Sequence, residues 1–250
     1  MPSSRKRNKA KERKAKKAES KIKLIRETWR GWVRGTTECN HNIIMPEDNH
    51  PVYSFIDSFC INNHNEMEVD QNLLATLKLH PQVWSNDSDL AMAICILIAI
   101  GTNFLLVNME ENSILYIAHA IIVLENYGRI GNFTASCNNR AAATKFRDLY
   151  SGGSTGDLRD LLKFFRKRLS CSCLKEMHLY ARKTQPKLGR CSHCHVAKER
   201  SLLMVCSRCM IDQYCSRRCQ VADWPRHKEC ECDRYVCVHR TLEEAKELGH

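Results

Sequence analysis

The sequence lacks the marks of a secreted protein and of an enzyme. Its first thirty residues contain no apolar core followed by a cleavage site, so no secretory signal is evident. No Ser/His/Asp set, phosphate-binding loop or open catalytic metal site is present, and we therefore expect a protein without enzymatic activity. Without a secretory route, the 15 cysteines should lie in a reducing compartment, the nucleus or the cytoplasm. In such a compartment, clustered cysteines are metal ligands more often than disulfide partners.

Basic stretches with interleaved aromatic residues, which are typical of single-strand nucleic-acid binding, are also missing. The formal net charge of +11 is unevenly distributed. Residues 1–34 hold 14 Lys or Arg and 3 acidic residues, residues 35–127 hold 12 acidic residues and one lysine, and residues 157–208 hold 13 Lys or Arg and 4 acidic residues. A nucleic-acid-binding protein that uses the basic tail and the basic helix near residue 158 is therefore an alternative, but not the favoured one.

The first segment of the chain, residues 1–34, is expected to be a solvated tail, disordered or partly helical. After Met1 it contains no aromatic or large aliphatic residue before Ile22, so it cannot bury a core. Its density of Lys and Arg is typical of a nuclear localisation or nucleic-acid patch. It is equally typical of a generic basic tail that pairs with the acidic middle of the chain.

The most hydrophobic run is LAMAICILIAIGTNFLLV, at residues 90–107. Its length is at the short end of what spans a membrane, and it carries Gly, Thr and Asn near its centre. A second apolar segment, ILYIAHAIIVLENY, follows a short acidic turn, with Ser113 as its expected N-cap and Gly128 as its expected end. This pattern favours the buried hairpin of a helical domain over a membrane anchor, and predicts a soluble protein.

Three further helices are predicted before the cysteine-rich end of the chain. They run through Arg140–Tyr150, from near Thr155 onward, and through Leu174–Arg182. The second of them is amphipathic and basic, with leucines on one face and Arg or Lys on another.

Other cysteine and histidine residues precede the cysteine-rich end. The stretch around Pro46 and Pro51 is expected to hold loops and short elements. Its cysteine and histidine residues are Cys39, His41, His50, Cys60 and His64. Their spacings match no metal site, so we expect ordinary buried or surface residues. Cys171 and Cys173 are separated by one residue, which makes a poor zinc knuckle, and are expected to be simple thiols.

Metal-ligand spacing dominates the sequence after residue 190. The candidate ligands are Cys191, Cys194, Cys206, Cys209, Cys215, Cys219, His227, Cys230 and Cys232. A Cys-x2-Cys knuckle delivers two sulfur atoms to one ion, and a structural zinc takes four such ligands in a tetrahedron. Four successive pairs therefore predict two zinc ions per chain, both fully coordinated and neither catalytic.

The residues between these ligands carry a family resemblance. The pattern Cys-x2-Cys…Cys-x2-Cys…Tyr-Cys-Ser-x2-Cys-Gln…Asp-Trp-x2-His-Lys…Cys resembles the MYND-type zinc finger over residues 191–232. The matching residues outside the ligands are Tyr214, Gln220, Asp223, Trp224 and Lys228. The resemblance implies interleaved sites, in which the first and third pairs bind one zinc ion and the second and fourth pairs bind the other.

The eighth ligand is ambiguous. The family usually has three residues between the histidine and the last cysteine, whereas here Cys230 leaves two and Cys232 leaves four. If the helix through Trp224 continues, Cys230 lies on nearly the same face as His227, which gives it a slight preference. If the helix ends at His227, either cysteine can reach the ion.

The resemblance also implies a function. In the family, short proline-containing peptides dock at positions that match Ser207, Gln220 and Trp224, although Trp224 could equally belong to the core of the finger. We therefore expect an adaptor that binds protein partners, with transcriptional regulation as one expected setting. Some lysine methyltransferases carry such a finger inside a split SET domain, but the flanking Asn-His-Ser-Cys type motif is missing here.

The predicted fold class is mainly α, with a helical body of unknown fold followed by a small two-zinc finger. Four segments are expected: a basic tail at 1–34, a helical body at 35–185, the finger at 191–232 and a C-terminal tail at 233–250.

Overall fold

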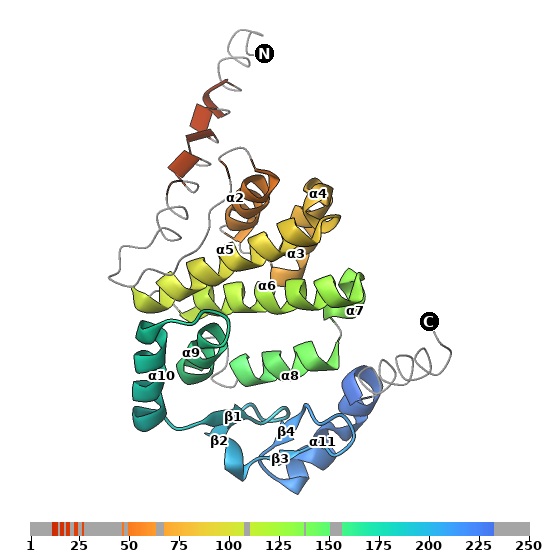
Figure 1. Cartoon of the computed structure of the whole chain (residues 1–250). Coiled ribbons are helices and arrows are strands. Elements are labelled where there is room, and N and C mark those ends of the chain that lie inside the picture. Colours follow the sequence, from red (N-terminus) through yellow and green to blue (C-terminus); the bar gives the residue numbers. More distant parts are fainter. Residues whose placement is uncertain are drawn as a thin grey trace, which may run out of the picture. The chain divides into compact units, whose positions relative to one another are not determined.

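The computed structural model of the chain is mainly helical, as predicted, with a few short strands near its C-terminal end (Figure 1). The structure describes residues 50–63, 68–107, 111–137, 139–150 and 157–232, together with a few positions between residues 12 and 47. Most of the basic tail, Cys39, His41, His64, residues 108–110 of the acidic turn and the C-terminal tail lie outside these residues. The chain divides into two compact units, Met1–Asn103 and Phe104–His250.

The first unit is built from α2 (Pro51–Asn63), α3 (Val69–Leu79), α4 (Pro81–Trp84) and most of α5 (Asp87–Leu106). The prediction of loops and short elements around Pro51 was wrong, because a helix of 13 residues begins there. Pro51 takes the first helical position, where its missing N–H costs no hydrogen bond. The apolar residues Val52, Phe55, Ile56 and Phe59 then follow at helical spacing, and all four are buried.

Helix α5 contains the most apolar run of the sequence. Asn86 caps it, since its Oδ1 accepts a hydrogen bond from the N–H of Ser88 at 2.9 Å. Among the described residues, α5 is the one helix long and apolar enough to cross a membrane by length and composition, and 67% of that apolar window is buried within the protein. Thr102 and Asn103 are buried as well.

We predict that the protein stays in the soluble fraction when membranes are extracted with alkaline carbonate. Asn103 and Thr102 would be costly against lipid, and the apolar side chains of α5 already have protein neighbours. A parallel extraction with high salt serves as the control, because it releases protein that adheres to membranes only through basic segments. Recovery of the protein in the carbonate-washed pellet would overturn the prediction.

The second unit begins with a layer of helices. These are α6 (Glu111–Ile130), α7 (Phe133–Cys137), α8 (Arg140–Leu149), α9 (Leu158–Arg166) and α10 (Ser172–Thr184). Both predicted bounds of the second apolar helix were wrong, because the expected N-cap Ser113 lies inside α6 and the helix continues past Gly128 to Ile130. The helix ends instead at Gly131, whose φ of 69° is the left-handed conformation that commonly closes a helix. Glycine inside a helix costs only about 1 kcal/mol, so it marks an end poorly.

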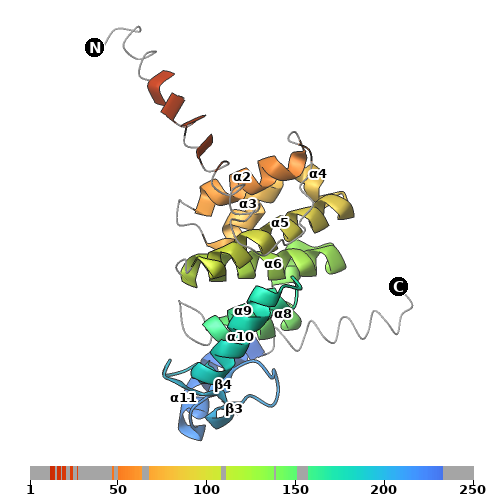
Figure 2. The ribbon, with the colours of Figure 1, turned by 60° about the vertical axis from the view of Figure 1, so that its left-hand side comes forward.

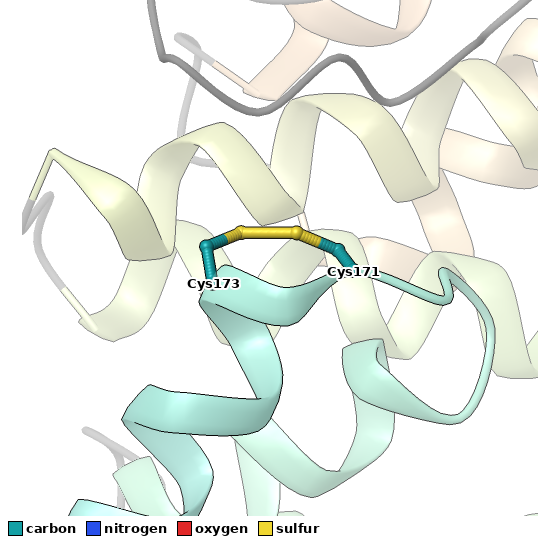
Figure 3. The surroundings of a disulfide bond; sticks show 2 residues. All are labelled: Cys171 and Cys173. Carbon is teal, nitrogen blue, oxygen red and sulfur yellow. A yellow bond between two sulfur atoms is a disulfide. The ribbon is translucent and has the colours of Figure 1, made fainter.

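Helix α9 packs against α10, α6 and α8 (Figures 1 and 2). Asp157 caps α9 by accepting from the N–H groups of Arg159 and Asp160. The expectation of simple thiols before α10 differs from the structure, in which Cys171 and Cys173 are joined by a disulfide at the start of that helix (Figure 3). Their Cα atoms are 5.5 Å apart, a separation that a disulfide can bridge.

The rest of the second unit contains two small hairpins and a helix. β1 (Leu188–Arg190) pairs antiparallel with β2 (Ala197–Glu199), and β3 (Met204–Val205) pairs antiparallel with β4 (Gln213–Tyr214). A short 3-10 turn, η2 (Arg200–Leu202), connects the hairpins. Helix α11 (Arg217–His227) follows β4 and passes into a single π-helical turn, η3 (Lys228–Cys232).

Candidate metal centre

Each hairpin holds one Cys-x2-Cys knuckle. In the first knuckle the N–H of His195 donates to the carbonyl of Cys191, and in the second the N–H of Met210 donates to the carbonyl of Cys206, both at 2.9 Å. His195 and Met210 share a φ of 59°, which is the left-handed region. The chain therefore makes the same closed turn twice, and each turn brings its two thiols to one side.

The first group of ligands consists of Cys191, Cys194, Cys215 and Cys219. The Sγ of Cys215 lies 3.6 Å from that of Cys194 and 3.5 Å from that of Cys219. A tetrahedral zinc ion with Zn–S bonds of about 2.3 Å has sulfur atoms about 3.8 Å apart, so the spacing fits the ion. Ser216 caps α11 through the N–H of Cys219, which fixes this ligand in the first turn of the helix.

The second group consists of Cys206, Cys209, His227 and Cys232, and all four are buried. The Nε2 of His227 lies 3.4 Å from the Sγ of Cys206 and 3.7 Å from that of Cys209. Its other ring nitrogen, Nδ1, lies 3.1 Å from a carboxylate oxygen of Asp212. A carboxylate behind a ligand histidine orients the ring and makes it a stronger ligand, so this group also suits zinc.

The two groups interleave along the chain, in the arrangement that the family resemblance implies. Cys232 completes the second group, whereas the slight preference had been for Cys230, whose side chain lies outside the described residues. That preference assumed continued α-helical winding after His227. The π-helical turn η3 instead pairs residues five apart, and Cys232 is five residues after His227.

The thiol pKa differs between the candidate ligand cysteines. Burial acts to raise the pKa of the Cys191 thiol, but backbone N–H groups of Cys194 and Cys215 outweigh it and lower that pKa to about 6. Burial raises the pKa of the Cys209 thiol to about 12. A buried thiol of this kind loses its proton when a cation replaces it, so zinc binding here releases protons.

A buried polar network ties β4 to α11. Tyr214 is fully buried and donates from its hydroxyl to the Asp223 carboxylate at 3.0 Å. Asp223, only 4% exposed, also accepts two hydrogen bonds from Arg226 at 2.8 and 2.9 Å. Burial, followed by the hydrogen bond to Asp223, raises the pKa of Tyr214, so the phenol stays protonated as a donor. The sequence pattern contained Tyr214 and Asp223, and the network explains their role in holding the two ligand groups together.

The three predicted docking residues line one groove on the finger. A cavity of about 280 Å³ is lined by Cys206, Ser207, Arg208, Arg217, Gln220, Val221 and Trp224. Trp224 is 37% exposed, and its ring also packs against that of His227 at 5.8 Å. Arg217 and Val221 also line the groove and were not among the predicted residues. Their spacing of three, four and seven residues along α11 puts 217, 220, 221 and 224 on one helix face, which was a readable signal.

The finger is attached to the helices of its own unit. Arg147 of α8 donates to the carbonyls of Met210 and Ile211, at 2.9 and 3.2 Å, in the loop after the second knuckle. Ala143 of α8 packs in the same apolar cluster as the buried ligand cysteines. Arg200 of the finger pairs with Asp160 of α9 at 2.8 Å. These contacts were not predictable from the sequence, because no short-range pattern connects residues 40 or more positions apart.

Comparisons with known proteins agree with this geometry. The family model of the MYND finger matches residues 191–232. Over 43 residues the chain is 49% identical to histone-lysine N-methyltransferase SMYD3 of Homo sapiens, and it has the same identity to the protein of that name from Mus musculus. The match covers 17% of this chain and spans 10% of the length of each of these curated relatives. No solved structure matches the chain. The protein thus contains, at residues 191–232, a MYND finger, which is a zinc-binding protein-interaction domain with two ligand groups.

Proposed function

We propose that the chain is an adaptor whose finger docks short, proline-containing peptides of partner proteins. The observation that carries the proposal is the groove of about 280 Å³ beside Trp224, which is partly exposed although Tyr214 of the same finger is fully buried. Val221, on the same helix face, is 60% exposed. An exposed aromatic next to an exposed aliphatic residue is a surface that prolines in an extended peptide can cover.

Polar groups of the groove support the same proposal. The Nη1 of Arg217 donates to Gln220 Oε1 at 2.7 Å, which leaves the amide NH2 of Gln220 for a peptide carbonyl. Arg208 and Arg217 put positive charge on the groove lining. We therefore propose that the preferred peptides carry an acidic residue close to the proline.

A binding role without catalysis is part of the proposal. Each ligand group offers four protein ligands, so a bound zinc ion keeps no open position for a substrate. The SMYD3 relatives are named as methyltransferases, but the similarity is confined to the finger, and their activity is not transferred. We propose an intracellular setting, nuclear or cytoplasmic, with transcriptional regulation as one role.

The test is a substitution of Trp224 by alanine in the full-length, zinc-loaded protein. A buried aromatic anchor typically contributes about 2 kcal/mol or more to an interface, so binding of labelled proline-containing peptides, measured by fluorescence anisotropy, should weaken at least about thirtyfold. Zinc content should stay unchanged. Leu202→Ala, which removes an exposed apolar side chain outside the groove, is the control. If Trp224→Ala released zinc, the tryptophan would be core and the docking proposal would fail.

A further inference from the structure

A second cavity lies between α9 and α10, away from the peptide groove. Its volume is about 300 Å³, which is at the lower end of the range for small-molecule sites. Both views show the two helices side by side (Figures 1 and 2). Six cationic side chains line this cleft: Arg159, Lys163, Arg166, Lys167, Arg182 and Lys187. We refer to it as the basic cleft.

Within the described part of the chain, the lining of the basic cleft carries far more positive than negative charge: six cationic side chains and the single carboxylate of Asp160, which interacts with Lys187. None of its six cationic side chains forms an ion pair there; Arg159 only donates to the carbonyl of Gln185, at 3.2 Å. Asp160 also lines the cleft, but it is already paired with Arg200. By contrast, nearby Arg168 pairs with Glu125 and lies outside the cleft. Like charges held together in this way cost stability unless an anion joins them.

His178 of α10 forms part of the cleft lining. It is only 5% exposed, and its Nδ1 has no hydrogen-bond partner in the part of the chain that the structure describes. Burial first, and then the positive charges of Arg166, Arg182, Arg159 and Lys163, lower the pKa of the ring. The imidazole therefore stays neutral at pH 7, which avoids a seventh positive charge in the cleft.

We infer that the basic cleft binds a compact anion that carries two or more phosphate groups. Each phosphate brings about −1.5 to −2 charges in a small volume, so two of them match this density of cations, whereas the carboxylates of a peptide bring one charge each. Arginine guanidinium groups bind phosphate oxygens with two parallel hydrogen bonds. Among the described residues that line the cleft there is no Phe, Tyr or Trp for base stacking, which disfavours single-stranded nucleic acid.

The experiment titrates inorganic diphosphate into the full-length, zinc-loaded protein, by calorimetry and by thermal unfolding. Saturable binding with a rise in Tm is expected, since a ligand of the native state stabilises it. The double variant Lys163→Gln/Arg182→Gln should weaken binding by roughly tenfold or more, because each charge-assisted hydrogen bond contributes appreciably. The matched control Lys175→Gln/Lys198→Gln removes the same charge from exposed lysines outside the cleft, and should change affinity less than about twofold.

Three outcomes would overturn the inference. In the first, sulfate at equal ionic strength raises Tm as much as diphosphate does. In the second, the two double variants weaken diphosphate binding equally. Either result would mean that the anion is attracted by the overall charge of the protein and not by a specific site. In the third, a single-stranded RNA oligonucleotide displaces diphosphate at a lower total concentration of phosphate groups than diphosphate itself needs. The cleft would then be a nucleic-acid-binding surface. Circular dichroism and zinc content, measured on every variant after titration, separate these outcomes from misfolding or from chelation of zinc. The result does not depend on the peptide groove, whose binding should be unchanged in both variants.

Discussion

Substitution of Cys215 by serine should lower the zinc content of the purified protein from about two ions per chain to one or fewer. The Sγ of Cys215 lies 3.6 Å from that of Cys194 and 3.5 Å from that of Cys219. Loss of this sulfur removes one of the four ligands of the tetrahedral zinc site, and no neighbouring ligand replaces it. Structural zinc contributes about 10–16 kcal/mol to the folding of isolated zinc fingers at neutral pH. A loss on this scale exceeds the total stability of most domains.

The second ligand group should loosen as well in the Cys215→Ser variant. Cys215 directly follows β4, whose Tyr214 joins the strand to α11 through Asp223, and α11 ends in the ligand His227. Elemental analysis and peptide binding should therefore both fall. Cys95→Ser, at an exposed cysteine outside both ligand groups, is the control and should keep two zinc ions. Retention of two zinc ions by Cys215→Ser would contradict the tetrahedral assignment.

The helices should survive this loss. The buried apolar residues of α6 and α9 are alanine, valine, leucine, isoleucine and phenylalanine, and none of them is a ligand cysteine. Far-ultraviolet circular dichroism of the Cys215→Ser variant should therefore keep most of its helical signal. A complete collapse of the helical signal would show that the finger is needed to fold the whole chain.

The finger was predictable from sequence to a degree that the helical body was not. A zinc ion requires fixed ligand spacings, so Cys-x2-Cys pairs are visible without any knowledge of long-range contacts. The same reasoning failed at the last ligand, because one π-helical turn changed which cysteine after His227 joins the group. Whether a single turn is α-helical or π-helical depends on how the end of the helix packs, and this packing cannot be predicted from the sequence pattern.

In the helical body, sequence periodicity predicted some helices correctly and missed others. Periodicity found α5, α8 and α10 nearly within their observed bounds, because each buries an apolar face of regular spacing. It missed α2, where Pro51 suggested a loop but occupies the first helical position instead. It also treated the finger and the helices before it as separate segments. Arg147 and Arg200 connect them through contacts that no local sequence pattern predicts.

Substitution of Arg200 by methionine should destabilise the second unit by about 3–5 kcal/mol, which is the usual result of leaving a buried charge without its partner. The Arg200 side chain is 14% exposed and that of Asp160 is 7% exposed, with 2.8 Å between Nη2 and Oδ2. Arg200 also donates to the carbonyl of Leu188 at 3.0 Å and pairs with Asp148 at 3.2 Å. Urea unfolding, followed by tryptophan fluorescence, measures the loss.

The electrostatics of Asp160 explain the direction of this effect. Burial raises the pKa of its carboxyl, the Arg200 guanidinium opposes that rise, and Asp157 adds to it. When the pKa of a carboxyl is higher in the native state than in the unfolded chain, the free energy of unfolding falls as the pH rises through the native pKa. The reason is that the buried group then ionises with little solvation. Removal of Arg200 raises the pKa of Asp160 further and enlarges this loss at neutral pH.

A double-mutant cycle separates the ion pair from the other contacts of Arg200. In the Asp160→Asn background the buried charge is absent, so Arg200→Met should cost clearly less than it does alone. Arg190→Met is the matched control, because Arg190 is exposed and its Nε donates to the carbonyl of His195 in its own hairpin. It should cost less than about 1 kcal/mol. Equal losses for Arg200→Met and Arg190→Met, or strict additivity with Asp160→Asn, would mean that the finger and α9 are held together by packing and not by this ion pair.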